Sequence, residues 1–267
     1  MKIKNLLLAL GIFFLLACEE EVPPPDFDEE EKLVVNSIIS PFSEEIIVEV
    51  SVSRNAFGII DGDFESDIVR DAIVTISDGT REVLIPFDDD QLHYSIPSFL
   101  FSLDEGKTFL LSVEANGESV YGETILPKRI TELESVTLNQ NNVLNVTWQD
   151  FTESDNYYRI LATGFNSEFQ FSENFFFESD EFISDTNRNG EVLSARGEGN
   201  EFATGGYDNV TVRIISSSSL YSDYFRILKN FVQDDPFADP VQLPSNIVGG
   251  IGIFEAVQVS EFTVEAP

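Results

Sequence analysis

Residues 45–53 read EIIVEVSVS, and this stretch decides the fold class of the chain. Every second residue from Ile46 to Val52 is apolar, and most of the residues between them are polar. Successive side chains of a β-strand point to opposite faces, so the alternation predicts a strand with one apolar face. The same period of two recurs along the chain, and we predict an all-β fold of antiparallel sheets. Two further sets carry this period: Ala72, Val74 and Ile76, and Phe109, Leu111, Val113 and Ala115.

Turn residues separate the strands of the N-terminal half. Asp78-Gly79 and Asn116-Gly117 accept positive φ angles, so both dipeptides predict two-residue hairpins of type I′. Residues 32–128 are therefore predicted to form a small antiparallel β-sandwich. Its strand pattern resembles the transthyretin-like or carboxypeptidase-regulatory β-domain, and that resemblance implies packing with no chemistry attached.

A second sandwich is predicted for residues 129–267, since Pro127 follows one strand and precedes a new alternating segment. A strand ending in the lone Trp148, then an acidic loop and Tyr157-Tyr158, resembles a fibronectin type III sandwich with Trp148 in its core. One helix is expected at about 219–232. Ser219 would cap it, and Pro236 would stop it.

The N-terminus predicts a lipid anchor. Lys2 and Lys4 precede an apolar run at 6–16, which is the layout of a signal peptide over residues 1–17. The sequence before Cys18 resembles a bacterial lipobox, which implies that this cysteine is lipidated; the alternative is an ordinary signal peptide that contains a cysteine. Residues 18–31 are acidic and proline-rich, so they read as an extended tether.

The acidic residues that follow Cys18 resemble the signal that sends Bacteroidota lipoproteins to the cell surface. This resemblance implies an outer-membrane protein that faces the exterior. The alternative is that these glutamates only solvate the tether.

The composition excludes several classes of function. The chain has 15 Lys+Arg against 48 Asp+Glu, a balance that repels phosphate backbones and argues against nucleic-acid binding. With the single histidine His93 and no cysteine besides Cys18, a Ser-His-Asp triad or a zinc site of several His or Cys ligands is not expected. No cofactor is implied. A hydrolase that uses a pair of carboxylates remains an alternative.

One loop carries the opening of a calcium motif. Asp185, Asn187, Asn189 and Glu191 supply alternating oxygen ligands around Gly190, as in the start of an EF-hand loop. The twelfth position, where that motif needs a bidentate glutamate, is occupied by arginine. A plain turn rich in Asn and Asp explains the same residues and is the preferred interpretation.

An aromatic run offers a possible docking element. Phe175, Phe176 and Phe177 are consecutive, so they cannot all face inward from one strand. Exposed aromatic side chains among acids suit the centre of a protein interface. A bulge, or a strand buried on both faces, is the other interpretation.

The most specific resemblance lies at the two ends of the folded region. KLVVN at residues 32–36, a helix leading into Asp235-Pro236-Phe237, and SNI at 245–247 followed by GGIGIF at 249–254 resemble a Bacteroidota lipoprotein family known as domain of unknown function 4249. The resemblance implies an outer-membrane lipoprotein that works beside TonB-dependent receptor barrels, and it supplies no catalytic residues.

The sequence therefore predicts an accessory lipoprotein that docks on a TonB-dependent transporter or a related envelope complex, with an unknown ligand. Two alternatives are a surface hydrolase with a carboxylate pair and a structural or adhesive envelope protein.

Overall fold

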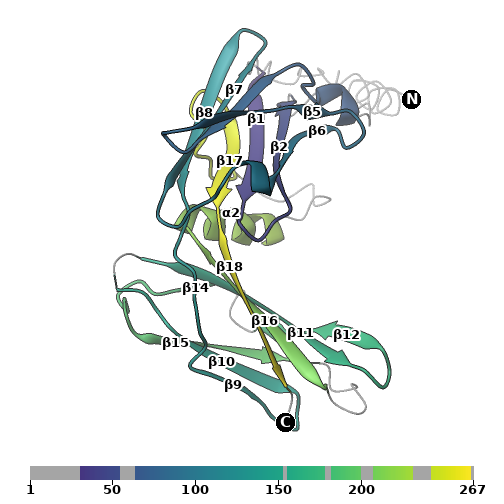
Figure 1. The fold of residues 1–267 in the computed structure, drawn as a ribbon, viewed down its shortest axis with the longest axis vertical. Coiled ribbons are helices and arrows are strands. Elements are labelled where there is room, and N and C mark those ends of the chain that lie inside the picture. The colour runs from purple at the N-terminus through teal and green to yellow at the C-terminus, as the bar shows by residue number, and fades with distance from the viewer. Residues whose placement is uncertain are drawn as a thin grey trace, which may run out of the picture. The chain divides into compact units, whose positions relative to one another are not determined.

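The computed structural model describes residues 31–54, 64–152, 155–177, 182–199, 207–230 and 242–265. The predicted signal peptide, Cys18 and nearly all of the tether lie outside these residues. Within them the chain forms several sheets, mostly antiparallel, and one α-helix near the C-terminal end (Figure 1). The prediction of an all-β fold with one helix is confirmed.

The first sandwich packs a five-stranded sheet, ordered β17-β1-β2-β6-β5, against a four-stranded sheet, ordered β4-β3-β7-β8. Two short 3-10 helices lie in its connections, η2 (Phe64–Asp67) and η3 (Ser98–Leu100). The strands are β1 (Leu33–Ile39), β2 (Glu45–Val52), β3 (Ile73–Ser77), β4 (Glu82–Ile85), β5 (Phe87–Asp88), β6 (His93–Pro97), β7 (Thr108–Ala115), β8 (Glu118–Ile125) and β17 (Ile251–Ala256).

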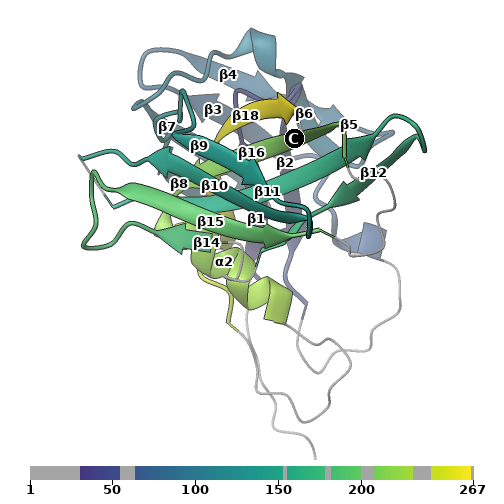
Figure 2. The same ribbon diagram turned by 90° about the horizontal axis from the view of Figure 1, so that it is seen from below.

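The second sandwich also has two layers. One sheet has the order β13-β15-β10-β9; the other has the order β12-β11-β16-β18, with β14 paired to β11 (Figure 2). Trp148 is fully buried between them and meets the ring of Tyr158 edge-on, with 5.5 Å between centroids. The strands are β9 (Ser135–Leu138), β10 (Val143–Gln149), β11 (Tyr157–Asn166), β12 (Phe171–Asn174), β13 (Phe176–Phe177), β14 (Phe182–Ser184), β15 (Val192–Glu198), β16 (Asn209–Ser217) and β18 (Gln258–Glu265).

The alternation in the sequence produces both cores. On β2, Ile46, Val48 and Val50 are buried while Ile47 and Glu49 between them face outward. On β7, Phe109, Leu111 and Val113 lie in the same core, which contains the buried apolar residues of both sheets of the first sandwich. The hydrophobic effect therefore fixes the register of these strands, since a slip of one residue would expose the apolar face.

The two sandwiches do not divide the chain at one point. The boundary predicted at 128/129 places Ile251–Ala256 in the second sandwich, but β17 pairs in parallel with β1, and Phe254 and Ala256 lie in the first core. In Figure 1 the yellow strand β17 lies beside the purple strand β1. After Val257 the chain continues directly as β18, which pairs with β16 of the second sandwich. A segment distant in sequence thus completes the N-terminal sheet.

The helix α2 (Ser219–Asn230) lies beside Val257, the residue between β17 and β18. Ser218, rather than the predicted Ser219, caps it, because the Ser218 hydroxyl accepts the Tyr221 N–H at 3.2 Å. Tyr221 packs with Phe182 and Val257 in a small apolar cluster of its own. The helix therefore rests on strands of both sandwiches. No helix among the described residues is both long and apolar enough to cross a membrane.

The two predicted turns differ in form. Asn116 and Gly117 both have positive φ and join β7 to β8 in a two-residue turn, as predicted. The Asp78-Gly79 turn is longer than predicted, since Ser77 pairs with Glu82 and four residues connect them. The Asp78 carboxylate accepts the Thr80 hydroxyl at 2.8 Å and the Thr80 and Arg81 N–H groups, so this side chain closes the longer loop. The hydroxyl bond first, and then the two backbone bonds, lower the pKa of Asp78.

Candidate functional site

The outward face of the sheet β4-β3-β7-β8 carries the most distinctive surface among the described residues. Its inward side chains fill the first core, and polar residues would ordinarily cover the other face. Here large apolar side chains stand outward instead, and Leu84 and Tyr121 are 60% and 54% exposed. We call this surface the apolar sheet face, and it consists of Ile73, Leu84, Leu110, Tyr121, Ile125 and Val248.

Strand pairing places three residues of the apolar sheet face in one row across the sheet. Tyr121 lies opposite Ser112, Ser112 opposite Thr75, and Thr75 opposite Leu84, which forms one row across all four strands. Val248 extends the row, because its N–H donates to the Tyr121 carbonyl at 2.8 Å and its carbonyl accepts the Tyr121 N–H at 3.2 Å. Directly paired side chains share a face, so the row has apolar ends and hydroxyl groups in its centre.

Three carboxylates stand among these apolar side chains. Glu114 lies directly opposite Ile73, and Glu123 lies directly opposite Leu110. The third, Glu82, lies opposite Ser77 at the edge formed by β4. Exposed apolar side chains and carboxylates therefore stand side by side on this face.

The predicted docking aromatics are divided between the interior and the surface. Phe175 is buried and packs on Tyr207, with 5.3 Å between ring centroids, and Phe177 packs against the second core. Phe176 alone points outward and is 75% exposed, on the short edge strand β13. The structure therefore leaves a single exposed aromatic ring at this position, opposite Glu198.

The side chains of the predicted calcium motif make separate contacts. The Asp185 carboxylate is fully buried and accepts the Asn156 N–H at 2.8 Å and the Asn156 side-chain amide at 2.9 Å. Asn187 has positive φ, and Asn189 donates to Asp155 at 3.4 Å. Glu191 is exposed. Among the described residues no group of three or more His, Cys, Asp and Glu could hold a metal ion, and calcium binding stays a prediction.

Two carboxylates meet inside the second sandwich. Asp150 is buried beside Asp185, accepts the Tyr158 hydroxyl at 2.5 Å and accepts the Gly190 N–H at 2.9 Å. Burial raises the pKa of Asp185, and the hydrogen bond and charge of Asp150 raise it further. A glycosidase needs its two carboxyl groups in a cleft that admits the sugar. Because Asp150 and Asp185 are almost fully buried, this pair suits a structural network better than a hydrolytic site.

A third buried carboxyl group lies near the start of α2. Glu255 of β17 is only 4% exposed, and its carboxylate accepts the Ser218 hydroxyl at 2.9 Å and the Thr124 hydroxyl at 3.5 Å. Burial raises the pKa of Glu255 to about 7, although the two hydroxyl donors favour the ionised form. This group therefore titrates near neutral pH.

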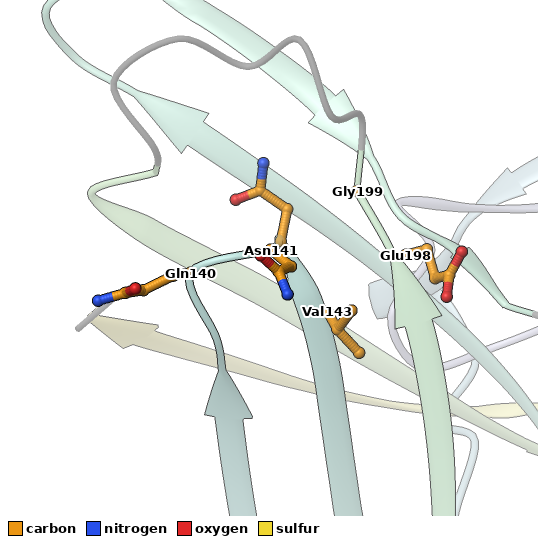
Figure 3. A pocket seen from close by; sticks show the side chains of 6 residues that line it. Gln140, Asn141, Val143, Glu198 and Gly199 are labelled. Atoms are coloured by element: carbon orange, nitrogen blue, oxygen red, sulfur yellow. The ribbon is translucent and has the colours of Figure 1, made fainter.

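A small pocket of about 380 Å³ opens at a turn of the second sandwich (Figure 3). It is lined by Gln140, Asn141, Asn142, Val143, Glu198 and Gly199. Figure 3 shows the side chains of Gln140 and Asn141 directed away from one another. The Glu198 carboxylate already accepts a hydrogen bond from Arg196 at 2.8 Å. The lining thus has no convergent set of groups for a ligand.

The single histidine and the single tryptophan both lie on strands. His93 lies on β6 and is half-buried, and its Nε2 atom has no hydrogen-bond partner among the described residues. Trp148 is a core residue, as the sequence indicates.

Sequence reasoning missed the apolar sheet face. The sequence does contain a signal for it. Consecutive apolar residues in Phe109-Leu110-Leu111 and Leu84-Ile85 place apolar side chains on both faces of a strand. Such runs indicate either a strand buried on both faces or an apolar outer face, and only the packing distinguishes these cases.

Comparison with known proteins gives one result. The family model described as "Domain of unknown function (DUF4249)" matches residues 19–263. No curated protein matches the chain significantly. The match spans both sandwiches, α2 and the strand β17 that joins the N-terminal sheet. The chain therefore belongs to the DUF4249 family.

Proposed function

We propose that this protein is an accessory lipoprotein of the outer membrane that docks on a TonB-dependent receptor barrel or a related envelope complex. The observation that carries the proposal is the apolar sheet face, with its six exposed side chains on neighbouring strands and the adjoining bridge. Isolated apolar side chains are normal on a protein surface, whereas several exposed on one sheet face favour an interaction site. Family membership supports the proposal, because the resemblance drawn from the sequence implies this setting.

In this proposal Cys18 carries the lipid and residues 18–31 form the tether. Replacing the cysteine in Cys18→Ser should move the protein from the membrane fraction to the soluble fraction, since a charged, acidic chain has little affinity of its own for anionic lipid. Immunoblotting of fractionated cells measures this. Protein that stays with the membrane after the substitution would contradict the lipid anchor. Protease added to intact cells tests the orientation, because a tether that faces the exterior should be cleaved.

The docking surface is tested by the double substitution Leu84→Ser and Tyr121→Ser. Both side chains are more than half exposed, so the fold should lose little stability. Removing two large apolar groups from the docking surface should weaken the complex by at least about tenfold. The measurement is the amount of partner that co-purifies with the tagged, full-length lipoprotein from native membranes in mild detergent.

Two control variants make this test specific. Val192→Ser removes an apolar side chain of similar exposure from the outer face of β15, and the complex should remain intact. Phe176→Ser tests the aromatic ring singled out by the sequence. Loss of the partner with Phe176→Ser alone would move the docking surface to the second sandwich. Recovery of the unaltered lipoprotein without any partner would overturn the proposed function itself.

A further inference from the structure

We infer that the partner which covers the apolar sheet face is a protein surface with lysine or arginine side chains around an apolar centre. The inference rests on the proposed function and specifies the chemistry of the partner. It comes from the charges of strands β3, β4, β7 and β8, which form the apolar sheet face. Their sequences are IVTIS, EVLI, TFLLSVEA and ESVYGETI, which contain four glutamates and no lysine, arginine or histidine.

The outward carboxylates on these strands face no cation across the part of the sheet that the structure describes. Glu114 is paired with Ile73, and Glu123 is paired with Leu110. Glu82 is paired with Ser77. None of the three carboxylates forms an ion pair with another residue that the structure describes. Lys107, directly before β7, is bound to Asp104 at 2.7 Å. Within the described residues, no ion pair therefore balances these three negative charges.

The outer faces of the second sandwich hold two ion pairs. On one sheet Arg213 of β16 pairs with Glu261 of β18 at 2.6 Å, and on the other Arg196 pairs with Glu198 at 2.8 Å. In both places the chain supplies its own cation to an outward glutamate, although it has only 15 Lys+Arg for 48 Asp+Glu. The apolar sheet face combines exposed apolar side chains with carboxylates that lack such a cation.

The physical chemistry of burial then selects the partner. A partner that covers Leu110 or Ile73 also removes water from the glutamate paired with that residue. Burying an unpaired carboxylate is unfavourable, so a neutral partner would lose much of the gain from apolar contact. An acidic surface would be repelled, whereas lysine or arginine at the rim would pair with the carboxylates and accelerate association. Charge complementarity therefore favours a basic partner.

The test uses a carbodiimide on intact cells that carry the full-length lipoprotein. This reagent joins a carboxylate to a lysine amine only when the two groups touch. The probe is the protein recovered in the co-purification experiment above, and mass spectrometry identifies the linked peptides. We expect links from Glu82, Glu114 or Glu123 to lysines of that protein. The contact between Lys107 and Asp104 supplies an internal positive control.

A matched pair of variants tests the energetic contribution of these charges. E82Q/E114Q/E123Q removes three negative charges from the face, and E132Q/E134Q/E168Q removes three exposed charges elsewhere. We expect the first variant to weaken binding of the partner by about tenfold, and the second by less than about twofold. Added salt should weaken the parent complex and have less effect on the first variant. Melting curves establish that both variants fold.

The outcomes separate the two proposals. Links that arise only from other carboxylates, or equal binding by the two triple variants, would overturn the inference. If Leu84→Ser with Tyr121→Ser abolishes the complex while E82Q/E114Q/E123Q leaves it intact, the docking function stands and the basic partner is wrong. If the parent protein recovers no partner, both proposals fail together.

Discussion

Gly252→Ala should prevent the C-terminal strand β17 from joining the first sandwich. Gly252 pairs with Val35 of β1 and has a φ of +123°, a conformation that residues with a side chain rarely adopt. A Cβ atom at this position would lie 2.0 Å from the Val35 carbonyl oxygen and 2.8 Å from its carbonyl carbon. Both atoms belong to the backbone, so the clash cannot be relieved by a change of rotamer.

Displacing β17 would expose Phe254 and Ala256, which the first core buries completely. We therefore expect a loss of at least about 3 kcal/mol in the free energy of unfolding, or a melting temperature lower by roughly 10 °C. Thermal denaturation followed by circular dichroism measures this. Hydrogen exchange should show faster exchange at the amides of β1 than in the parent protein, because β1 loses its parallel neighbour.

Gly106→Ala is the matched control for the backbone conformation. Gly106 also has positive φ, at +73°, but a Cβ atom there would meet nothing within 4 Å. Its substitution should cost only about 1 kcal/mol, which is the preference of glycine for this region. If both variants melted at the same temperature, the close approach of β17 to β1 would not determine stability.

Glu255→Gln should stabilise the protein at alkaline pH and have little effect in mild acid. The pKa of Glu255 is raised to about 7 in the folded protein, against 4.5 for an ordinary glutamate. The folded state therefore holds its proton more tightly than the unfolded state does. This contribution to stability is complete below the unfolded pKa and is lost as the pH rises through the folded pKa.

The size of the effect follows from the difference between the two pKa values. Above pH 7 the folded protein must hold a buried, ionised carboxylate, at a cost on the order of 3 kcal/mol. Glutamine stays neutral, so the variant should gain about this amount at roughly pH 8.5 and less than about 1 kcal/mol near pH 5. Urea denaturation at the two pH values measures the difference.

Glu118→Gln is the control, because Glu118 is an exposed residue at the β7–β8 turn. It should alter stability by no more than about 0.5 kcal/mol at either pH. A Glu255→Gln variant that gained the same stability at both pH values would show that its effect is one of packing and not of charge. Both Glu255 and Gly252 lie on β17, so these experiments examine the same connection between the two sandwiches.

Much of the architecture could be predicted because it depends on local periodicity. The alternation around Ile46 and around Phe109 identified strands whose inward residues are those of the first core. The Asn116-Gly117 turn followed from the φ angles that these two residues accept. The helix followed from its spacing, although its cap is Ser218 rather than Ser219.

The pairing of β17 with β1 could not be predicted in the same way. Residues 251–256 follow the rest of the predicted second sandwich. Their own pattern does not indicate that they pair with a strand at the opposite end of the chain. The glycines did indicate a close backbone approach. They did not indicate which strand would be approached.

The candidate site was less predictable than the fold. The run Phe175-Phe176-Phe177 suggested exposed aromatic rings, but burial of Phe175 and the packing of Phe177 leave only Phe176 outside. Conversely, Leu84 and Tyr121 lie on different hairpins and are separated in sequence, and strand pairing brings them into one row. A surface of this kind exists only when the register of four strands is known.

The sequence by itself determined the fold class, most of the strands and the acidic charge of the chain, and it predicts an anchor at Cys18 with its tether. These features depend on side-chain period, composition and short motifs, which are properties of neighbouring residues. Only the tertiary structure decided that β17 completes the N-terminal sheet, that Glu255 is buried, and that the apolar sheet face is exposed. The reason is that burial depends on which distant segments cover a strand, and that choice reflects the packing energy of the whole chain.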